Sequence, residues 1–239
     1  MTHATRNPLS LLLIAAMVVA LGASQSSALE LNRTFSDDMV LQRDKPVNVW
    51  GTAKKGTTIS VKFAGQTVKA TADKEGRWVA TLKPMGASPK GQALRCQVSG
   101  VRDQVEIENV VIGDVFLFAR QSSIDVSLGT TAEGKKAAAG AKGFRFIRIK
   151  TSPSRTALDN LKEDATAGWQ VADKKSALAM SAAAFYLGRD LAKDVDVPIG
   201  IVDLDMGYHF PGAWLSDEGQ EQALTIPGAG AEDLKRERE

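Results

Sequence analysis

A long apolar stretch that ends abruptly in polar residues constrains the fold of this chain most. Residues 110–119 are rich in β-branched and aromatic side chains, and Arg120, Gln121, Ser122 and Ser123 follow them. The pattern predicts a strand that is buried on both faces and ends in a polar turn. Ligands of open parallel sheets bind where the strands end, so Ser122 occupies a candidate nucleophile position. A serine after a strand is also typical of a turn or a helix N-cap, and this stretch alone leaves both interpretations open.

The N-terminus has the composition of a secretory signal peptide. Arg6 precedes an apolar run over residues 11–21, and small and polar residues follow up to Ser26 and Ala28. We expect cleavage after Ala28, which removes residues 1–28. An uncleaved membrane anchor is the alternative, but a spanning helix needs about 20 apolar residues, more than this run provides. The sequence therefore predicts a secreted or periplasmic protein with no membrane segment after cleavage.

The composition argues against several classes of protein. The 239 residues are 44% hydrophobic and 24% charged, which is typical of a globular chain. The formal net charge is +2 and no basic stripe carries aromatic residues, so no nucleic-acid partner is expected. Cys96 is the only cysteine, which excludes an intramolecular disulfide and favours a packing role in its alternating segment. The sequence has no cluster of metal ligands, and we expect no metal and no cofactor.

Two regions with different patterns follow the signal peptide. Residues 29–109 contain short alternating runs separated by turns rich in glycine and proline, which predict a β-sandwich accessory domain. Residues 110–217 combine strand candidates with a helix and predict a βαβ unit of an α/β domain. Residues 218–239 are predicted to form a polar tail. The fold class expected is therefore α/β with an N-terminal all-β module.

The clearest helix in the sequence is predicted over residues 176–193. Ser176 is the predicted cap, and the apolar residues that recur on one face are Met180, Ala184, Leu187 and Leu191. Met180 and Phe185 are therefore predicted core residues. Strands are predicted over residues 144–150 and 198–204, before and after this helix.

Several motifs in this chain follow one another in a characteristic order. They are Phe-Ser-Asp-Asp-Met-Val-Leu-Gln-Arg-Asp at residues 35–44, Val-Trp-Gly at 49–51, Asp-Lys-Glu-Gly-Arg-Trp at 73–78, Gly-Asp-Val-Phe-Leu at 113–117, Trp-Gln at 169–170, residues 181–191 and Val-Pro-Ile-Gly-Ile at 197–201. Together they resemble the sialate O-acetylesterases, a branch of the SGNH or GDSL-like serine esterases, over residues 30–217. The resemblance implies a β-sandwich followed by a partial SGNH-type three-layer domain with a parallel sheet. It also implies hydrolysis of O-acetyl esters on sialic acid or related carbohydrates, so a carbohydrate ester or a glycan is the expected partner.

The resemblance assigns site residues at two positions. The family's nucleophile motif Gly-Gln-Ser-Asn-Met falls on residues 120–124, where Ser122 is the implied nucleophile and Arg120 replaces the glycine. A second motif, Gly-Gly-Thr-Pro-Ile-Glu-Ala-Trp, falls on residues 207–214, where only Gly207 and the final Ala-Trp are kept. The implied oxyanion donors are the backbone N–H groups of Ser122 and Gly207.

A serine nucleophile also requires a base, and no motif of the family supplies one in this sequence. In the family an Asn-bearing motif and an Asp-x-x-His pair lie farther along, and the sequence ends before such a segment. The histidines are His3 and His209. A pair of Ser122 and His209, with Asp203 or Asp205 orienting the imidazole, is one interpretation; a histidine in surface or loop packing is the other.

Three functional hypotheses follow from this incomplete set of catalytic residues. The chain is a carbohydrate O-acetylesterase, a non-catalytic exported relative that binds a glycan or a protein, or a truncated esterase product. Because the base is missing, we expect hydrolysis to be absent or very weak. A partial α/β domain also leaves an exposed sheet edge, which predicts self-association.

Overall fold

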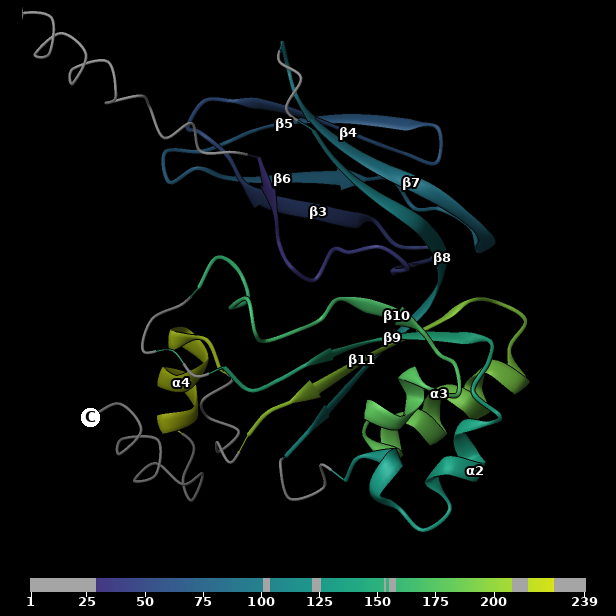
Figure 1. Cartoon of the computed structure of the whole chain (residues 1–239). Coiled ribbons are helices and arrows are strands. Elements are labelled where there is room, and N and C mark those ends of the chain that lie inside the picture. Colours follow the sequence, from purple (N-terminus) through teal and green to yellow (C-terminus); the bar gives the residue numbers. More distant parts are fainter. Residues whose placement is uncertain are drawn as a thin grey trace, which may run out of the picture.

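The computed structural model describes residues 29–100, 104–121, 126–152, 154, 158–207 and 215–225, so the predicted signal peptide lies outside the described residues. The described chain is mostly β-sheet with few helices (Figure 1). The strands are β1 (Glu30–Leu31), β2 (Val40–Gln42), β3 (Val47–Thr52), β4 (Thr58–Phe63), β5 (Gln66–Thr71), β6 (Arg77–Leu82), β7 (Ser88–Val98), β8 (Gln104–Arg120), β9 (Phe144–Ile149), β10 (Trp169–Val171) and β11 (Ile199–Asp205). The helices are η2 (Leu128–Thr130), α2 (Gly134–Ala138), η3 (Ser176–Ala179), α3 (Ala182–Asp194) and α4 (Asp217–Leu224).

The strands form a small antiparallel sheet and a large mixed sheet. The small sheet has the order β1-β3-β6, and the large one has the order β10-β9-β11-β8-β7-β4-β5, with β2 pairing β8 in addition. Buried and exposed residues alternate along β3 and β6, so each buries one face. Val49 and Trp78 of the small sheet belong to the same core cluster as Ile59, Leu94 and Ile107 of the large sheet. The two sheets therefore share one hydrophobic core, which also includes Ile147, Ile149 and Trp169 of the C-terminal region.

β8 is the strand that links the two parts of the molecule. It runs without a break across the predicted boundary between residues 109 and 110, pairing antiparallel with β7 before Gly113 and parallel with β11 after it. Burial on both faces holds for Val110, Val111 and Ile112, but Leu117 is 65% exposed. The prediction of a fully buried strand is therefore wrong beyond Gly113, because no described segment covers this face at Leu117.

The C-terminal region contains the parallel strands β8, β11 and β9, with β10 antiparallel outside β9. β9 and β11 are parallel neighbours joined through α3, as the predicted βαβ unit requires. Figure 1 shows α2 and α3 on one side of these strands, and Phe185 of α3 packs with Phe144, Phe146 and Ile201. No helix within the described ranges is long and apolar enough to cross a membrane.

The predicted helix over residues 176–193 is wrong in its first part. Residues 176–179 form the short helix η3, the chain is extended at Met180, and α3 begins at Ala182. The interruption has a tertiary cause, because Ser181 forms an isolated β-bridge with Ser127 and donates its N–H to Asp203 Oδ2 at 3.1 Å. Met180 and Phe185 are fully buried, which confirms their predicted core positions.

The predicted polar tail falls partly on an ordered element. α4 covers the beginning of residues 218–239, and its first turn is capped by Ser216, whose Oγ accepts the N–H of Gly219. Residues 226–239 lie outside the described residues.

Candidate functional site

The carboxyl ends of β8 and β11 form the edge where the sequence places the candidate site. The two strands are parallel, with Asp205 beside Arg120 in register, so both end at the same edge of the sheet. Ser122 and His209 lie outside the described residues. The structure therefore defines this edge through Arg120, Asp203, Asp205 and Gly207, and the roles of Ser122 and His209 stay predictions.

A buried ion pair occupies the edge directly before the nucleophile position. Arg120 Nε donates to Asp203 Oδ1 at 2.9 Å, and both side chains are 0% exposed. The second carboxylate oxygen of Asp203 accepts the backbone N–H of Ser181 at the start of α3. A buried carboxylate needs such partners, because desolvation without them costs several kcal/mol, on the order of 3–5 when one partner is removed. The residue that replaces the family's glycine is thus fixed inside the fold.

Asp205 and Gly207 close the end of β11 in a tight turn. Gly207 adopts a positive φ of 67° and donates its N–H to Asp205 Oδ1 at 2.9 Å. The same carboxylate oxygen lies 3.8 Å from Arg120 Nη1, and Met206 donates its N–H to the carbonyl oxygen of Arg120. The N–H that the resemblance assigns to the oxyanion hole therefore already has an acceptor, and its use in catalysis requires this bond to open.

Ser181 is a member of this cluster that the sequence reasoning missed. Its side chain is fully buried, and its Oγ has no hydrogen-bond partner among the described residues. The sequence does contain a signal for the cluster: Arg120 and Asp203 are charged residues at the end of, or within, apolar strands. A charged residue buried in an apolar strand needs a partner of opposite charge. The sequence therefore predicts that an ion pair exists here, but not which residues form it.

The Gly-Asp motif at residues 113–114 lies at the other end of the parallel segment of β8, and its contacts hold neighbouring segments together. Gly113 passes so close to Pro198 that a Cβ at this position would lie 1.9 Å from the Pro198 carbonyl oxygen. Asp114 donates its N–H to that oxygen, and its carboxylate accepts two hydrogen bonds from the guanidinium of Arg43, at 2.8 and 3.0 Å. These hydrogen bonds, opposed in part by desolvation, hold the pKa of Asp114 below its usual value.

A groove of about 360 Å³ lies away from the predicted site. It is found at the amino ends of β9 and β11 and is lined in part by Pro89, Phe144, Arg145, Val195 and Pro198. Gly207, the predicted site residue that the structure describes, does not line it. Within the described ranges no three His, Cys, Asp or Glu side chains are grouped so that they could hold a metal ion.

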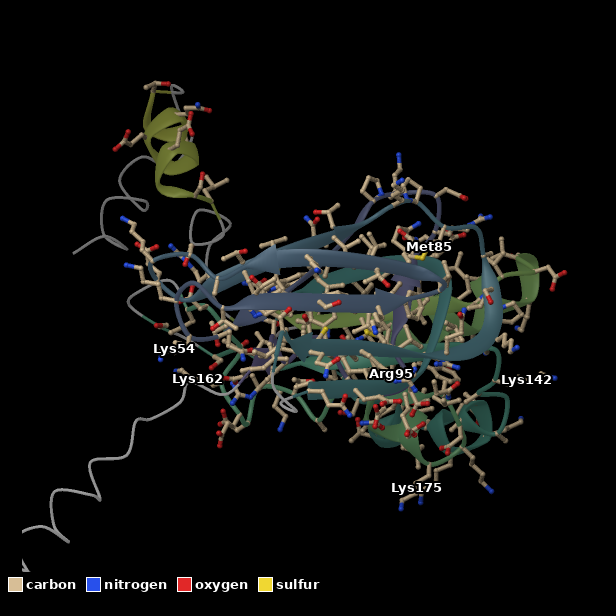
Figure 2. All side chains as sticks on the ribbon, turned by 90° about the horizontal axis from the view of Figure 1, so that it is seen from above. Lys54, Met85, Arg95, Lys142, Lys162 and Lys175 are labelled. Carbon is tan, nitrogen blue, oxygen red and sulfur yellow. The ribbon has the colours of Figure 1, made fainter. Side chains whose placement is uncertain are left out.

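Lysine side chains are spread around the molecule. Figure 2 shows Lys54 and Lys162 on one side of the molecule, Lys142 on the opposite side and Lys175 at the lower border, and all four are exposed.

Comparison with known proteins relates the chain to carbohydrate esterases. No family model matches the sequence. The mouse sialate O-acetylesterase is 25% identical over 216 residues, which cover 84% of this chain and 39% of the mouse protein. The human sialate O-acetylesterase is 23% identical over 215 residues, which cover 82% of this chain and 40% of the human protein. The chain thus spans about two fifths of the length of these curated relatives.

A solved structure extends this relationship to the fold. The crystal structure of a carbohydrate acetylesterase from Xanthomonas citri superimposes with a TM-score of 0.71 at 27% identity, and the match covers 84% of this chain and 45% of that one. The sequence and structure matches together show a sialate O-acetylesterase-like relationship, as the ordered motifs predicted.

Proposed function

We propose that this chain is a carbohydrate-ester-recognising relative of the sialate O-acetylesterases in which hydrolysis at Ser122 is absent or very weak. The observation that carries the proposal is the buried ion pair of Arg120 and Asp203 immediately before the nucleophile position. The curated relatives and the Xanthomonas citri carbohydrate acetylesterase support the substrate class, a carbohydrate that carries acetyl esters.

The charged residues near the site support loss of hydrolysis. The motif of the active family has a glycine before Gln-Ser, where the backbone can approach the substrate closely. Here Arg120 is anchored by Asp203, so the side chain and the strand end are held together by a contact that the glycine cannot make. Residue 120 therefore stabilises the edge of the sheet instead of forming part of a catalytic turn.

The carboxylates of Asp203 and Asp205, which could orient a catalytic histidine, also accept hydrogen bonds from other groups of the protein. Asp203 accepts from Arg120 with one oxygen and from Ser181 with the other, while Asp205 accepts from Gly207. A carboxylate that orients a catalytic histidine must accept the imidazole N–H. Asp203 uses both of its oxygens on groups of the protein itself, which supports the interpretation in which it does not orient His209 as a base.

An esterase assay tests the proposal directly. The purified chain, Ser122→Ala and His209→Ala are compared with p-nitrophenyl acetate and with an O-acetylated sialic acid. We expect the same background rate in all three proteins and retention of the acetylated sugar on a glycan array. A rate that either substitution abolishes contradicts the loss of hydrolysis, and the absence of glycan binding contradicts recognition of the carbohydrate ester.

For the fold we infer a β-sandwich accessory domain over residues 29–109, followed by a partial SGNH-type three-layer domain over residues 110–217. The separate small sheet β1-β3-β6 and the parallel order β9-β11-β8 with α3 on one side support this division. A crystal structure that also defines residues 122–125 and 208–214 tests it. Helices on both faces of the parallel strands are the expected result, and an uncovered second face contradicts the three-layer arrangement.

For the location we propose export followed by cleavage after Ala28. The mature protein then begins at Leu29, the residue before β1. Intact mass measurement of the protein recovered from the periplasm or the medium tests this, and a retained N-terminal segment contradicts it.

A further inference from the structure

The groove at the amino ends of β9 and β11 has walls that are largely apolar. Its volume of about 360 Å³ is that of a site for a small molecule. Val111, Phe144 and Ile199 line it and are buried. The groove lies at the end of the parallel strands opposite to the predicted nucleophile position, so it is separate from the predicted esterase site. Its walls favour a ligand with an apolar body, which gains by leaving water.

Arg145 brings a half-buried positive charge to this groove, where it is the only cation among the described lining residues. Its guanidinium donates to the carbonyl oxygen of Asn109 and, at 3.3 Å, to Asn109 Oδ1. Within the described ranges no carboxylate oxygen lies within 4.0 Å of its nitrogens. A guanidinium has five N–H groups, so three are left for a ligand. Desolvation lowers the pKa of Arg145, and the more distant Asp38 carboxylate offsets this only in part.

The fold holds the Arg145 guanidinium in place through two residues with an unusual backbone. Asn109 has a φ of 53° and Asp38 a φ of 65°, and Asn109 Nδ2 donates to Asp38 Oδ1 at 2.6 Å. Gly91 of β7 passes so close that a Cβ there would lie 2.1 Å from Asn109 Oδ1. Positive φ in residues other than glycine carries strain, and such strain clusters at functional sites. Arg145 is therefore fixed beside β7 and β8, which both contribute to the wall of the groove.

We propose that the groove binds a small monocarboxylic acid with an apolar body, whose carboxylate accepts hydrogen bonds from Arg145. A carboxylate matches the planar donors of a guanidinium, and an arginine stays charged at every physiological pH. Asp196, the only anion among the described lining residues, is exposed and repels a second negative charge. The groove therefore favours a monoanion over a dianion. This ligand is distinct from the carbohydrate ester of the proposed function.

Titration of the purified chain with benzoate, followed by calorimetry and by protein NMR, tests the proposal. We expect a Kd on the order of 1 mM, as is usual for so small a ligand. Benzyl alcohol has the ring without the charge and acetate has the carboxylate without the ring, so each binds about tenfold more weakly or less. Arg145→Gln weakens benzoate binding about tenfold. The matched control is Arg95→Gln, because Arg95 is exposed on β7 and does not line the groove.

A second variant does not depend on the stability of the first. Asp196→Asn removes a like charge from the groove and tightens benzoate binding about threefold, a gain that misfolding cannot produce. A chain that does not bind benzoate overturns the proposal, and so does equal binding of benzyl alcohol or of acetate. Unchanged affinity in Arg145→Gln or in Asp196→Asn, or an equal loss in Arg95→Gln, overturns it as well.

The two proposals fail separately. Benzoate binding that persists when an O-acetylated sialic acid is bound supports a separate groove, and competition between the two ligands overturns the separation. Benzoate binding by a chain that retains no glycan overturns the proposed function and leaves the groove standing.

Discussion

The two halves of β8 differ in how they are held in the fold. Before Gly113 the strand pairs with β7, exposes the charged residues Glu106 and Glu108 and buries Ile107, like an ordinary half-buried strand. After Asp114 it is apolar up to Arg120, pairs with β11 on one edge, has no described strand on its other edge and ends in a buried ion pair. The first half is thus stabilised as a half-buried strand, and the second by its pairing with β11 and by ion pairs at its two ends, Asp114 with Arg43 and Arg120 with Asp203.

The contrast places the departure from the family's nucleophile motif at the carboxyl end of β8. The half of β8 that leads to Ser122 keeps the apolar character of the family's strand, but a buried charge stands at its end. Substitutions along β8 and its neighbours test whether the two halves are indeed stabilised by different interactions.

The largest effect is expected at the end of the second half. Arg120→Met leaves the Asp203 carboxylate buried without its guanidinium partner and lowers the free energy of unfolding by about 3–5 kcal/mol. Urea denaturation measures the change. The control is Arg95→Met on β7, because the pair that Arg95 forms with Glu106 of the first half is exposed and contributes less than about 1 kcal/mol. Equal losses in the two variants contradict the contrast between the halves.

A double variant sharpens this first prediction. Arg120→Met with Asp203→Asn removes the buried charge but keeps an acceptor for Ser181 N–H, so it is expected to be more stable than Arg120→Met alone. If the double variant is the less stable of the two, the cost of Arg120→Met does not come from the unpaired Asp203 carboxylate.

The next effect is expected where the halves meet. Gly113→Ala places a Cβ against the Pro198 carbonyl oxygen and displaces backbone that cannot move freely, at a cost of about 1–3 kcal/mol. Thermal unfolding measures it against Gly86→Ala, a position where an added Cβ meets open space and φ is not positive. The control should stay within about 0.5 kcal/mol of the unmodified chain. If Gly113→Ala is as stable as the control, the backbone where the two halves of β8 meet can move to accommodate a Cβ.

A smaller, pH-dependent effect is expected at Asp114. Its folded pKa is lowered, chiefly by the hydrogen bond from Arg43, so the pair stabilises the fold above the unfolded pKa of about 3.9 and this contribution is lost as the pH falls through the folded pKa. Arg43→Met lowers stability at neutral pH by about 0.5–1 kcal/mol and reduces its acid dependence. The carboxyl chemical shift of Asp114 reports its pKa, which should rise toward the ordinary value; an unchanged pKa contradicts the assigned cause.

The smallest response is expected from Cys96, which lies on β7 opposite Val105 of the first half. Cys96 is fully buried, and desolvation raises the pKa of its thiol to about 12, so at pH 8 only about one molecule in ten thousand carries a thiolate. Native protein should not react with iodoacetamide, whereas protein in denaturant should react fully. Rapid labelling without denaturant shows that the first half of β8 opens more readily than its burial implies.

Much of the fold could be predicted because its pattern is local. The alternating runs of the N-terminal region became strands, β9 and β11 formed close to their predicted positions, and Met180 and Phe185 are buried as expected. The helix over residues 176–193 was predicted too long, because contacts of Ser181 with Ser127 and Asp203 hold the chain extended before α3. Helical periodicity does not contain these distant partners.

By itself the sequence determined the ordered family motifs, the replacement of the family's glycine by Arg120 and the apolar strand that leads to Ser122. Only the tertiary structure decided that Arg120 is paired with Asp203, 83 residues away, and that Gly207 N–H is given to Asp205. It also decided that, within the described ranges, no strand pairs with the outer edge of β8 after Gly113. The physical reason is that periodicity reports the surroundings of neighbouring residues, whereas charge pairing and edge exposure depend on which distant strands lie side by side.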